Sequence, residues 1–209
     1  MTSYVFGHKN PDSDTVCSAI ALANLKTKLG EESIPVIQSN INPETKFVLE
    51  KFGVATPEVM TSVVGKNVYL VDHSDLAQSM DDVGEANILG IVDHHKLGDV
   101  TTSQPLECWI WPVGCTGTVL KAMYDFFKVD ISKKMAGIML CSIVSDTVIF
   151  KSATCTDQDK AACEDLAKIA GVNDIQTLGM DMFKVKSAVE GTPVRELVLR
   201  DYKDFDMSG

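Results

Sequence analysis

The chain has 209 residues, of which 45% are hydrophobic and 23% charged, enough for one well-buried domain or for one domain plus part of a second. Its formal net charge of -10 argues against a nucleic-acid groove, because binding to a phosphate backbone favours a basic face. A phosphate substrate is not excluded, because clustered carboxylates can hold divalent cations that present positive charge. No apolar run is long enough to cross a bilayer, and the N-terminus lacks the regions of a signal peptide, so we expect a cytoplasmic protein with no membrane partner.

Short apolar runs alternate with longer helical patterns along the chain. The predicted strands are residues 3–8, 34–39, 67–72, 86–93 and 106–113, and the predicted helices are residues 15–29, 44–53, 116–127, 133–144, 158–170 and 175–184. Strands that are apolar almost throughout are typical of a parallel sheet covered on both faces. The sequence therefore predicts an α/β fold, with a mostly parallel sheet flanked by helices on both faces.

The end of the chain differs from the rest in composition. Residues 188–209 are charged and lack a core-forming pattern. We expect residues 1–188 to form one metal-binding catalytic domain, and residues 189–209 to be a linker or the start of another domain. The cysteines form no C-x-x-C pair and lie mostly in apolar surroundings, which favours buried free thiols in a reducing cytosol: Cys17, Cys108, Cys115, Cys141, Cys155 and Cys163.

Histidine and aspartate residues, which commonly bind metals, follow three of the predicted strands. In an open parallel sheet, ligands bind outside the carboxyl ends of the strands, so we expect these side chains to meet at one edge. Asp146, in "SIVSDT", would add a fourth set if it joins them. The residues are His8, Asp12 and Asp14 after the first strand, Asp72 at the end of the third, and Asp93, His94 and His95 at the end of the fourth.

Several carboxylates brought together in this way would repel one another, and burial would raise the pKa of some of them. Divalent cations remove that conflict, and mixed His/Asp ligation suits manganese, cobalt or magnesium better than a thiolate-rich zinc site does. Two ions about 3.5–4 Å apart are a known arrangement for phosphoryl hydrolysis.

Each residue also has a structural explanation. A lone His8 is more often a structural or surface histidine, and Asp12 and Asp14 suit turns and helix N-caps. Asp72 and Asp93 could each cap a following helix. The joint pattern favours a metal site, because all four histidines of the chain lie in or beside these strand-end segments.

The segments "GHKNPDSD", "LVDHSD", "IVDHH", "PVGCTGT" and "SIVSDT" resemble, in order, the motifs of the DHH phosphoesterases, and most closely those of family II, or manganese-dependent, inorganic pyrophosphatases. The string "KSATCTDQDKAACEDLAKIAG" resembles the same family. The resemblance implies hydrolysis of inorganic pyrophosphate to two orthophosphates by a hydroxide that bridges two metal ions. It also implies two Mn²⁺ or Co²⁺ ions per active site, with Mg²⁺ arriving with the substrate.

The resemblance implies roles for individual residues as well. His8, Asp12 and Asp72 match the ligands of the first metal, whereas Asp14, Asp72, His94 and Asp146 match those of the second, with Asp72 bridging. His95 matches a histidine beside the substrate phosphate, so Asp72 and His95 are the predicted catalytic residues.

Three further residues are predicted to bind substrate. Lys203 matches a phosphate-contacting lysine of the family, with a solvated linker charge as the alternative. Gly114 and Thr116 lie where a loop enters a helix, at which backbone amides can approach an anion. Ordinary capping by Thr116 or Thr118 is the alternative there.

Two departures from the family pattern stand out. Ser74 replaces the usual Asn, and the family normally continues beyond the position of Gly209 into a C-terminal domain that supplies Arg and Lys contacts to pyrophosphate. With that substrate-binding domain absent, we expect weak or no activity from the chain alone. Family members often dimerise through an edge strand of this domain, and the strand that carries Trp109 and Trp111 on one face suits either the core or an interface.

Two other functions stay open from the sequence. One is a related DHH phosphodiesterase that acts on short oligonucleotides or cyclic dinucleotides. The other is a non-catalytic module for metal binding or dimerisation.

Overall fold

The computed structural model describes residues 1–187; Lys203 and the predicted linker lie outside this range. The strands are β1 (Ser3–Phe6), β2 (Ser33–Ile37), β3 (Glu58–Val59), β4 (Asn67–Val71), β5 (Asn87–Asp93) and β6 (Glu107–Ile110). The α-helices are α1 (Ser13–Lys28), α2 (Pro43–Phe52), α3 (Thr116–Phe127), α4 (Lys133–Asp146), α5 (Asp157–Ala170) and α6 (Ile175–Lys186), and two single-turn 3₁₀ helices are η1 (Leu76–Gln78) and η2 (Val83–Glu85). Every predicted strand and helix is present; β3 and the two 3₁₀ helices are additional.

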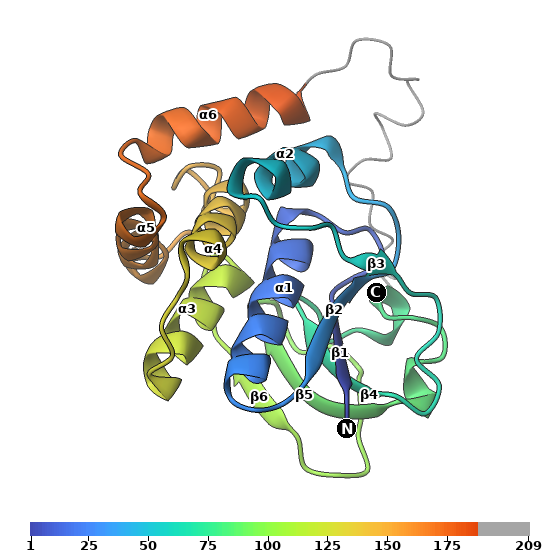
Figure 1. Ribbon diagram of the computed structural model, residues 1–209. Coiled ribbons are helices and arrows are strands. Elements are labelled where there is room, and N and C mark those ends of the chain that lie inside the picture. Colours follow the sequence, from blue (N-terminus) through green and yellow to red (C-terminus); the bar gives the residue numbers. More distant parts are fainter. Residues whose placement is uncertain (188–209) are drawn as a thin grey trace.

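The sheet has the order β3-β2-β1-β4-β5-β6, and each neighbouring pair is parallel. All carboxyl ends therefore point to one edge, which is the upper edge in Figure 1. The strand order reverses between β1 and β4, and ligands bind at such a reversal in open α/β sheets. The predicted α/β class and parallel sheet are confirmed.

The two faces of the sheet are covered differently. Helix α1 packs against β1, β2 and β4, and α3 packs against β5, while α4, α5 and α6 stack outside them on the same side (Figure 1). On the other face Phe6, Leu70 and Ile91 pack with Met80 and Val83, which belong to the η1–η2 region. The expected second layer of helices is thus reduced, within the described residues, to 3₁₀ turns and loops.

Local caps explain where several helices begin and end. The Asn42 side chain accepts a hydrogen bond from the Thr45 amide at the start of α2, and Thr156 and Asp159 form a capping box at the start of α5. Gly53 and Gly171 end α2 and α5 in the left-handed conformation that glycine adopts without strain.

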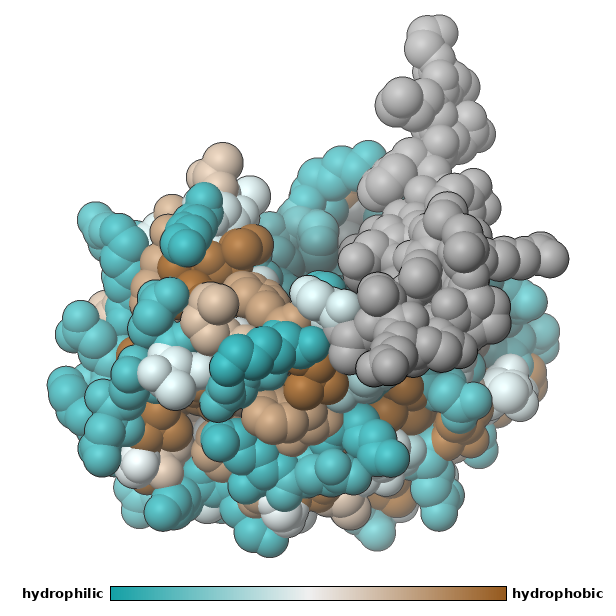
Figure 2. All heavy atoms as spheres, turned by 90° about the horizontal axis from the view of Figure 1, so that it is seen from above, coloured by the Kyte–Doolittle hydropathy of each residue, from teal (hydrophilic) through white to brown (hydrophobic). Residues whose placement is uncertain are grey.

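None of the described helices is long and apolar enough to cross a membrane. Seen from above, the described surface shows hydrophilic side chains around scattered apolar ones (Figure 2). The cysteines all lie in the described range and are free thiols; four of them are buried, whereas Cys108 is exposed.

Candidate metal centre

The turn from β1 into α1 supplies the first ligand-type side chains. Asp12 is the N-cap of α1, and its Oδ1 accepts a hydrogen bond of 2.9 Å from the Thr15 amide. Its other oxygen, Oδ2, lies 3.3 Å from His8 Nε2. The capping role and the predicted ligand role of Asp12 therefore coexist, because they use different oxygens.

Asp72 occupies the centre of the cluster. It directly follows β4, is buried, and has a left-handed φ of 62°, which is uncommon for a residue other than glycine. Its Oδ2 lies 3.3 Å from His8 Nε2, and its Oδ1 lies 3.4 Å from His94 Nε2. One carboxylate thus lies between two imidazoles, at the point where the strand order reverses.

Two threonines hold the Asp72 carboxylate in place. Thr15 Oγ1 donates to Oδ2 at 2.6 Å, and Thr116 Oγ1 donates to Oδ1 at 3.3 Å. Gly7 permits the first contact, because a Cβ atom at that position would lie only 2.5 Å from Thr15 Cγ2.

His94 is oriented by the backbone. Its Nδ1 lies 3.1 Å from the carbonyl oxygen of Val113, so Nδ1 donates to that oxygen and Nε2 faces the cluster. Nε2 lies 3.9 Å from Asp14 Oδ2 and 3.9 Å from Asp146 Oδ2. Histidines that bind a metal through one ring nitrogen commonly donate the N–H of the other to a carbonyl oxygen, as His94 does here.

Asp14 and Asp146 complete the carboxylate set. The fully buried Asp14 accepts hydrogen bonds from the amides of Thr116 (2.8 Å) and Gly117 (3.2 Å) and from the Ser18 hydroxyl (2.7 Å). Asp146 is the last residue of α4, where the helix dipole disfavours negative charge. Burial, followed by the charge of Asp14, raises the pKa of Asp146 well above its usual value.

His95 differs from His94 in its exposure, with 42% of its side chain accessible. Its Nδ1 lies 2.9 Å from Asp93 Oδ1, the oxygen that also accepts the amides of His94 (2.8 Å) and His95 (3.0 Å). The His95 Nε2 is then the ring nitrogen left to meet a ligand. The sequence singled out Asp93 only as a strand-end carboxylate; its role in orienting two histidines emerges from the structure.

The pKa values of the cluster show that its carboxylates favour positive charge nearby. Burial opposes protonation of His8, but Asp12 and Asp72 outweigh it and raise the pKa of His8 to about 10. Burial likewise opposes protonation of His94, whose pKa Asp72 raises to about 9. Burial and the Asp72 charge raise the pKa of Asp14 to about 6. The carboxylates that raise these imidazole pKa values would equally favour bound divalent cations.

The donor set fits divalent cations. Both ring nitrogens of His8 are buried without a hydrogen-bond partner among the described residues, although Nε2 faces two carboxylates. An imidazole nitrogen in that position is explained by a metal ion. Three groups have ligand atoms within 4.8 Å of one another: His8, Asp12 and Asp72; Asp72, His94 and His95; and Asp14, Cys115 and Asp146. The six predicted metal ligands are thus brought together.

Neither Cys115 nor His73 was predicted as a metal ligand, and the structure places them differently. Cys115, expected only as a buried thiol, is the N-cap of α3 and lies beside Asp14 and Asp146. His73 points away from the cluster, with Nδ1 2.9 Å from the Val71 carbonyl oxygen and Nε2 2.8 Å from Ser79 Oγ.

The predicted substrate contacts of Gly114 and Thr116 are not supported by this arrangement. The Gly114 amide donates to Asp159 Oδ2 at 2.9 Å, and the Thr116 amide donates to Asp14 Oδ2 at 2.8 Å. Because the protein's own carboxylates take up both amides, neither is directed at an incoming anion.

Ser74, predicted to depart from the family pattern, is directed at the loop after His95. Its Oγ accepts the Gly98 amide at 2.8 Å, and its carbonyl oxygen would lie 2.2 Å from a Cβ atom at Gly98. This close packing fixes the loop that follows the two histidines.

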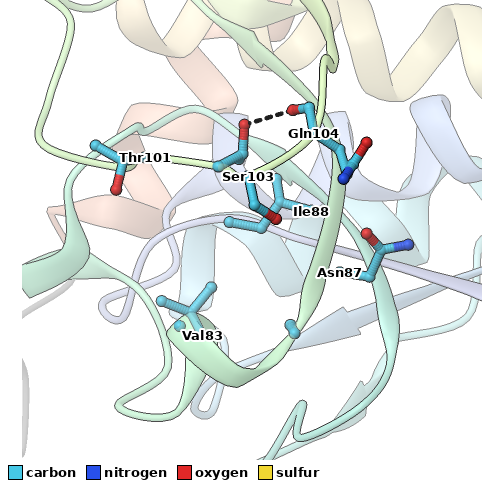
Figure 3. A pocket seen from close by; sticks show the side chains of 9 residues that line it. Val83, Asn87, Ile88, Thr101, Ser103 and Gln104 are labelled. Carbon is cyan, nitrogen blue, oxygen red and sulfur yellow. Dashed lines mark hydrogen bonds between the residues drawn. The ribbon is translucent and has the colours of Figure 1, made fainter.

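A separate pocket of about 210 Å³ lies between the segment entering β5 and the loop before β6 (Figure 3). It contains none of the predicted site residues and no charged side chain: its lining is Val83, Gly84, Ala86, Asn87, Ile88, Thr101, Thr102, Ser103 and Gln104. This pocket is therefore separate from the candidate metal centre at the carboxyl ends of the strands.

Comparison with known proteins gives a consistent result. Residues 2–143 match the DHH family, N-terminal domain. The chain is 54% identical to "Probable manganese-dependent inorganic pyrophosphatase" of Archaeoglobus fulgidus over 99% of its own length and 68% of that protein. It is 49% identical to "Manganese-dependent inorganic pyrophosphatase" of Methanothrix thermoacetophila, over 99% of this chain and 66% of the relative. The chain therefore spans about two thirds of the length of these curated relatives.

Solved structures agree. A Methanococcus jannaschii protein assigned to the family II inorganic pyrophosphatases superposes with a TM-score of 0.92 at 43% identity, covering 99% of this chain and 69% of that one. An exopolyphosphatase-related protein from Bacteroides fragilis shares the fold alone, with a TM-score of 0.67 at 13% identity, over 89% of this chain and 56% of that one.

Proposed function

Because the chain belongs to the DHH family and, within it, to the manganese-dependent inorganic pyrophosphatases, we propose that it hydrolyses inorganic pyrophosphate to two orthophosphates with Mn²⁺ as its cofactor. The observation that carries this proposal is the Asp72 carboxylate between His8 Nε2 and His94 Nε2. Co²⁺ is proposed as a substitute for Mn²⁺, and Mg²⁺ as an ion that arrives with the substrate.

The residues divide into two overlapping ligand sets. His8, Asp12 and Asp72 would hold one ion, and Asp14, Asp72, His94 and Asp146 would hold the other. Ions held there would supply a water of lowered pKa and would neutralise charge on phosphate oxygens.

Other residues of the protein orient the predicted ligands. The Val113 carbonyl fixes the tautomer of His94, and Thr15 and Thr116 fix the rotamer of Asp72. We assign His95 to the substrate. Because its Nδ1 is bonded to Asp93, His95 would face a phosphate oxygen with Nε2, and a hydrogen bond from that nitrogen would stabilise developing negative charge.

The direct test measures orthophosphate release from pyrophosphate by the purified chain with Mn²⁺, beside a cyclic dinucleotide and a short oligonucleotide. We expect release from pyrophosphate that EDTA abolishes. We expect it to be weak beside the Archaeoglobus fulgidus relative, of which the chain covers 68%. Preferential cleavage of a nucleotide would support the phosphodiesterase alternative. Mn²⁺ binding without hydrolysis of any substrate would support a metal-binding module.

We also propose that the chain forms a homodimer through the edge strand β6. Trp109 on this strand contacts the ring of Phe126 with centroids 5.3 Å apart, and Phe126 is 67% exposed. An edge strand that pairs on only one side within the described residues, beside the exposed Phe126, is suited to pairing with a second copy. Sedimentation equilibrium is expected to give twice the 22.7 kDa chain mass, and Phe126→Lys to shift the protein toward monomer. A monomer at every concentration tested would refute the pairing.

A further inference from the structure

We propose that Asp159, on α5, is a positioning residue for the metal centre, although it touches none of the predicted metal ligands. This inference rests on the proposed function, because it concerns how tightly the same centre holds Mn²⁺. The assignment follows from two sets of hydrogen bonds that meet in the loop between β6 and α3.

The first set is made by Asp159 itself, which is completely buried. Its Oδ2 accepts hydrogen bonds from the Thr156 amide (2.7 Å), the Thr156 hydroxyl (2.7 Å) and the Gly114 amide (2.9 Å). Its Oδ1 accepts from the Thr118 hydroxyl at 2.5 Å. One carboxylate therefore closes the capping box of α5 and also holds both ends of the segment 114–118.

The second set is made by the loop that Asp159 holds. The Val113 carbonyl oxygen orients His94, and the amides of Thr116 and Gly117 orient Asp14. These groups lie between or directly beside Gly114 and Thr118, the two residues that Asp159 anchors. The position of the loop thus sets the direction of two predicted metal ligands.

The loop has little room to adjust. A Cβ atom at Gly114 would lie 2.9 Å from Asp159 Oδ2 and 2.8 Å from Thr147 Cγ2, so the backbone packs directly against α5 and the end of α4. Removing the carboxylate would leave the buried Gly114 amide without its acceptor, which favours movement of the loop toward another partner. That movement would carry the Val113 carbonyl and the Thr116 amide with it.

The test compares Asp159→Ala, Asp159→Asn and Asp157→Ala with the wild type. Asp157 is the matched control, because it is in the same first turn of α5, is 98% exposed and pairs only with Lys160 in the contacts described. The readout is the Kd for Mn²⁺, measured from the electron paramagnetic resonance signal of free Mn²⁺ at a temperature where circular dichroism shows each variant folded.

We expect Asp159→Ala to weaken Mn²⁺ binding about 10-fold, the lower end of the range for outer partners of metal ligands. Asp159→Asn should recover most of the affinity, because its amide oxygen can still accept from Gly114 and Thr156. Asp157→Ala should bind as the wild type does. If Asp159→Ala does not fold, Thr118→Val removes only the Oδ1 contact, and a weaker affinity in that variant supports the same inference.

Two outcomes would overturn the inference and they are distinguishable. A lowered melting temperature with unchanged Mn²⁺ affinity in both Asp159→Ala and Thr118→Val would reduce Asp159 to a helix cap. Absence of Mn²⁺ binding by the wild type would overturn the proposed function, and with it any positioning role.

Discussion

Asp72→Asn is expected to lower the affinity for Mn²⁺ by more than about 100-fold, because changes to the outer partners of metal ligands already cost about 10–100-fold. Asn tolerates the left-handed φ of 62° at this position, so the strand end should keep its conformation. What the substitution removes is the negative charge between His8 and His94. Hydrolysis of pyrophosphate should fall by at least the same factor.

Two further variants make this result specific. Asp81→Asn removes an exposed carboxylate paired with Lys9 and should leave Mn²⁺ binding unchanged. His95→Gln should also retain Mn²⁺ but weaken binding of the non-hydrolysable analogue imidodiphosphate to the Mn²⁺-loaded protein by about 10–100-fold, the worth of a hydrogen bond to a charged group. Isothermal titration calorimetry measures both affinities. Near-wild-type Mn²⁺ binding by Asp72→Asn would exclude a shared ligand at this position.

The stability of the metal-free protein is expected to fall as the pH rises from 6.5 toward 10. The folded protein holds protons on His8, with a pKa of about 10, and on His94, with a pKa of about 9, which the unfolded chain releases near pH 6.5. This stabilisation is complete below pH 6.5 and is lost as the pH passes through these folded-state values. Asp14, with its pKa of about 6, acts in the same direction at lower pH, between 3.8 and 6.

Bound Mn²⁺ should reverse this trend, because metal binding requires the deprotonated imidazoles and carboxylates. The rise in melting temperature on adding Mn²⁺ is therefore expected to be larger at pH 8.5 than at pH 6. Differential scanning calorimetry in excess EDTA and in excess Mn²⁺ gives the two values at each pH, and Asp72→Asn is the control that should show little shift at either. A Mn²⁺-induced shift that stays constant or shrinks with pH would contradict the predicted ligands.

Much of the fold and of the candidate centre could be predicted from the sequence because both depend on local patterns. Apolar runs that end in His or Asp mark the carboxyl ends of β1, β4 and β5, and parallel topology brings these ends to one edge. The convergence of His8, Asp72 and His94 follows from that rule alone. Family motifs then added Asp146, which belongs to a helix and could not have been placed by strand ends.

The remaining features depend on contacts between carboxylate side chains and backbone amides far apart in the sequence, which leave no periodic signal. Asp159 meets Gly114 across 45 positions, and Thr116 meets Asp14 across 102. The loop around Gly114 was expected to receive an anion because its glycines and helix start permit it, but the sequence cannot show that a carboxylate of the protein fills that position. His73 shows a different limit: its hydrogen bonds to Val71 and Ser79 are local, but its sequence context "VDHS" resembles "VDHH" and does not show that its side chain faces away from the cluster.

The order of the ligands along the chain has a consequence for the folding kinetics. They extend from His8 to Asp146, and the contacts between them close only when β1, β4, β5 and α4 are all in place. Contacts between residues so far apart in the sequence form late in folding, because the entropy of closing the intervening loops must be lost before the contacts stabilise the chain. A cation that needs the completed arrangement cannot nucleate collapse, so it should prolong the lifetime of the native state against unfolding and leave the rate of refolding nearly unchanged.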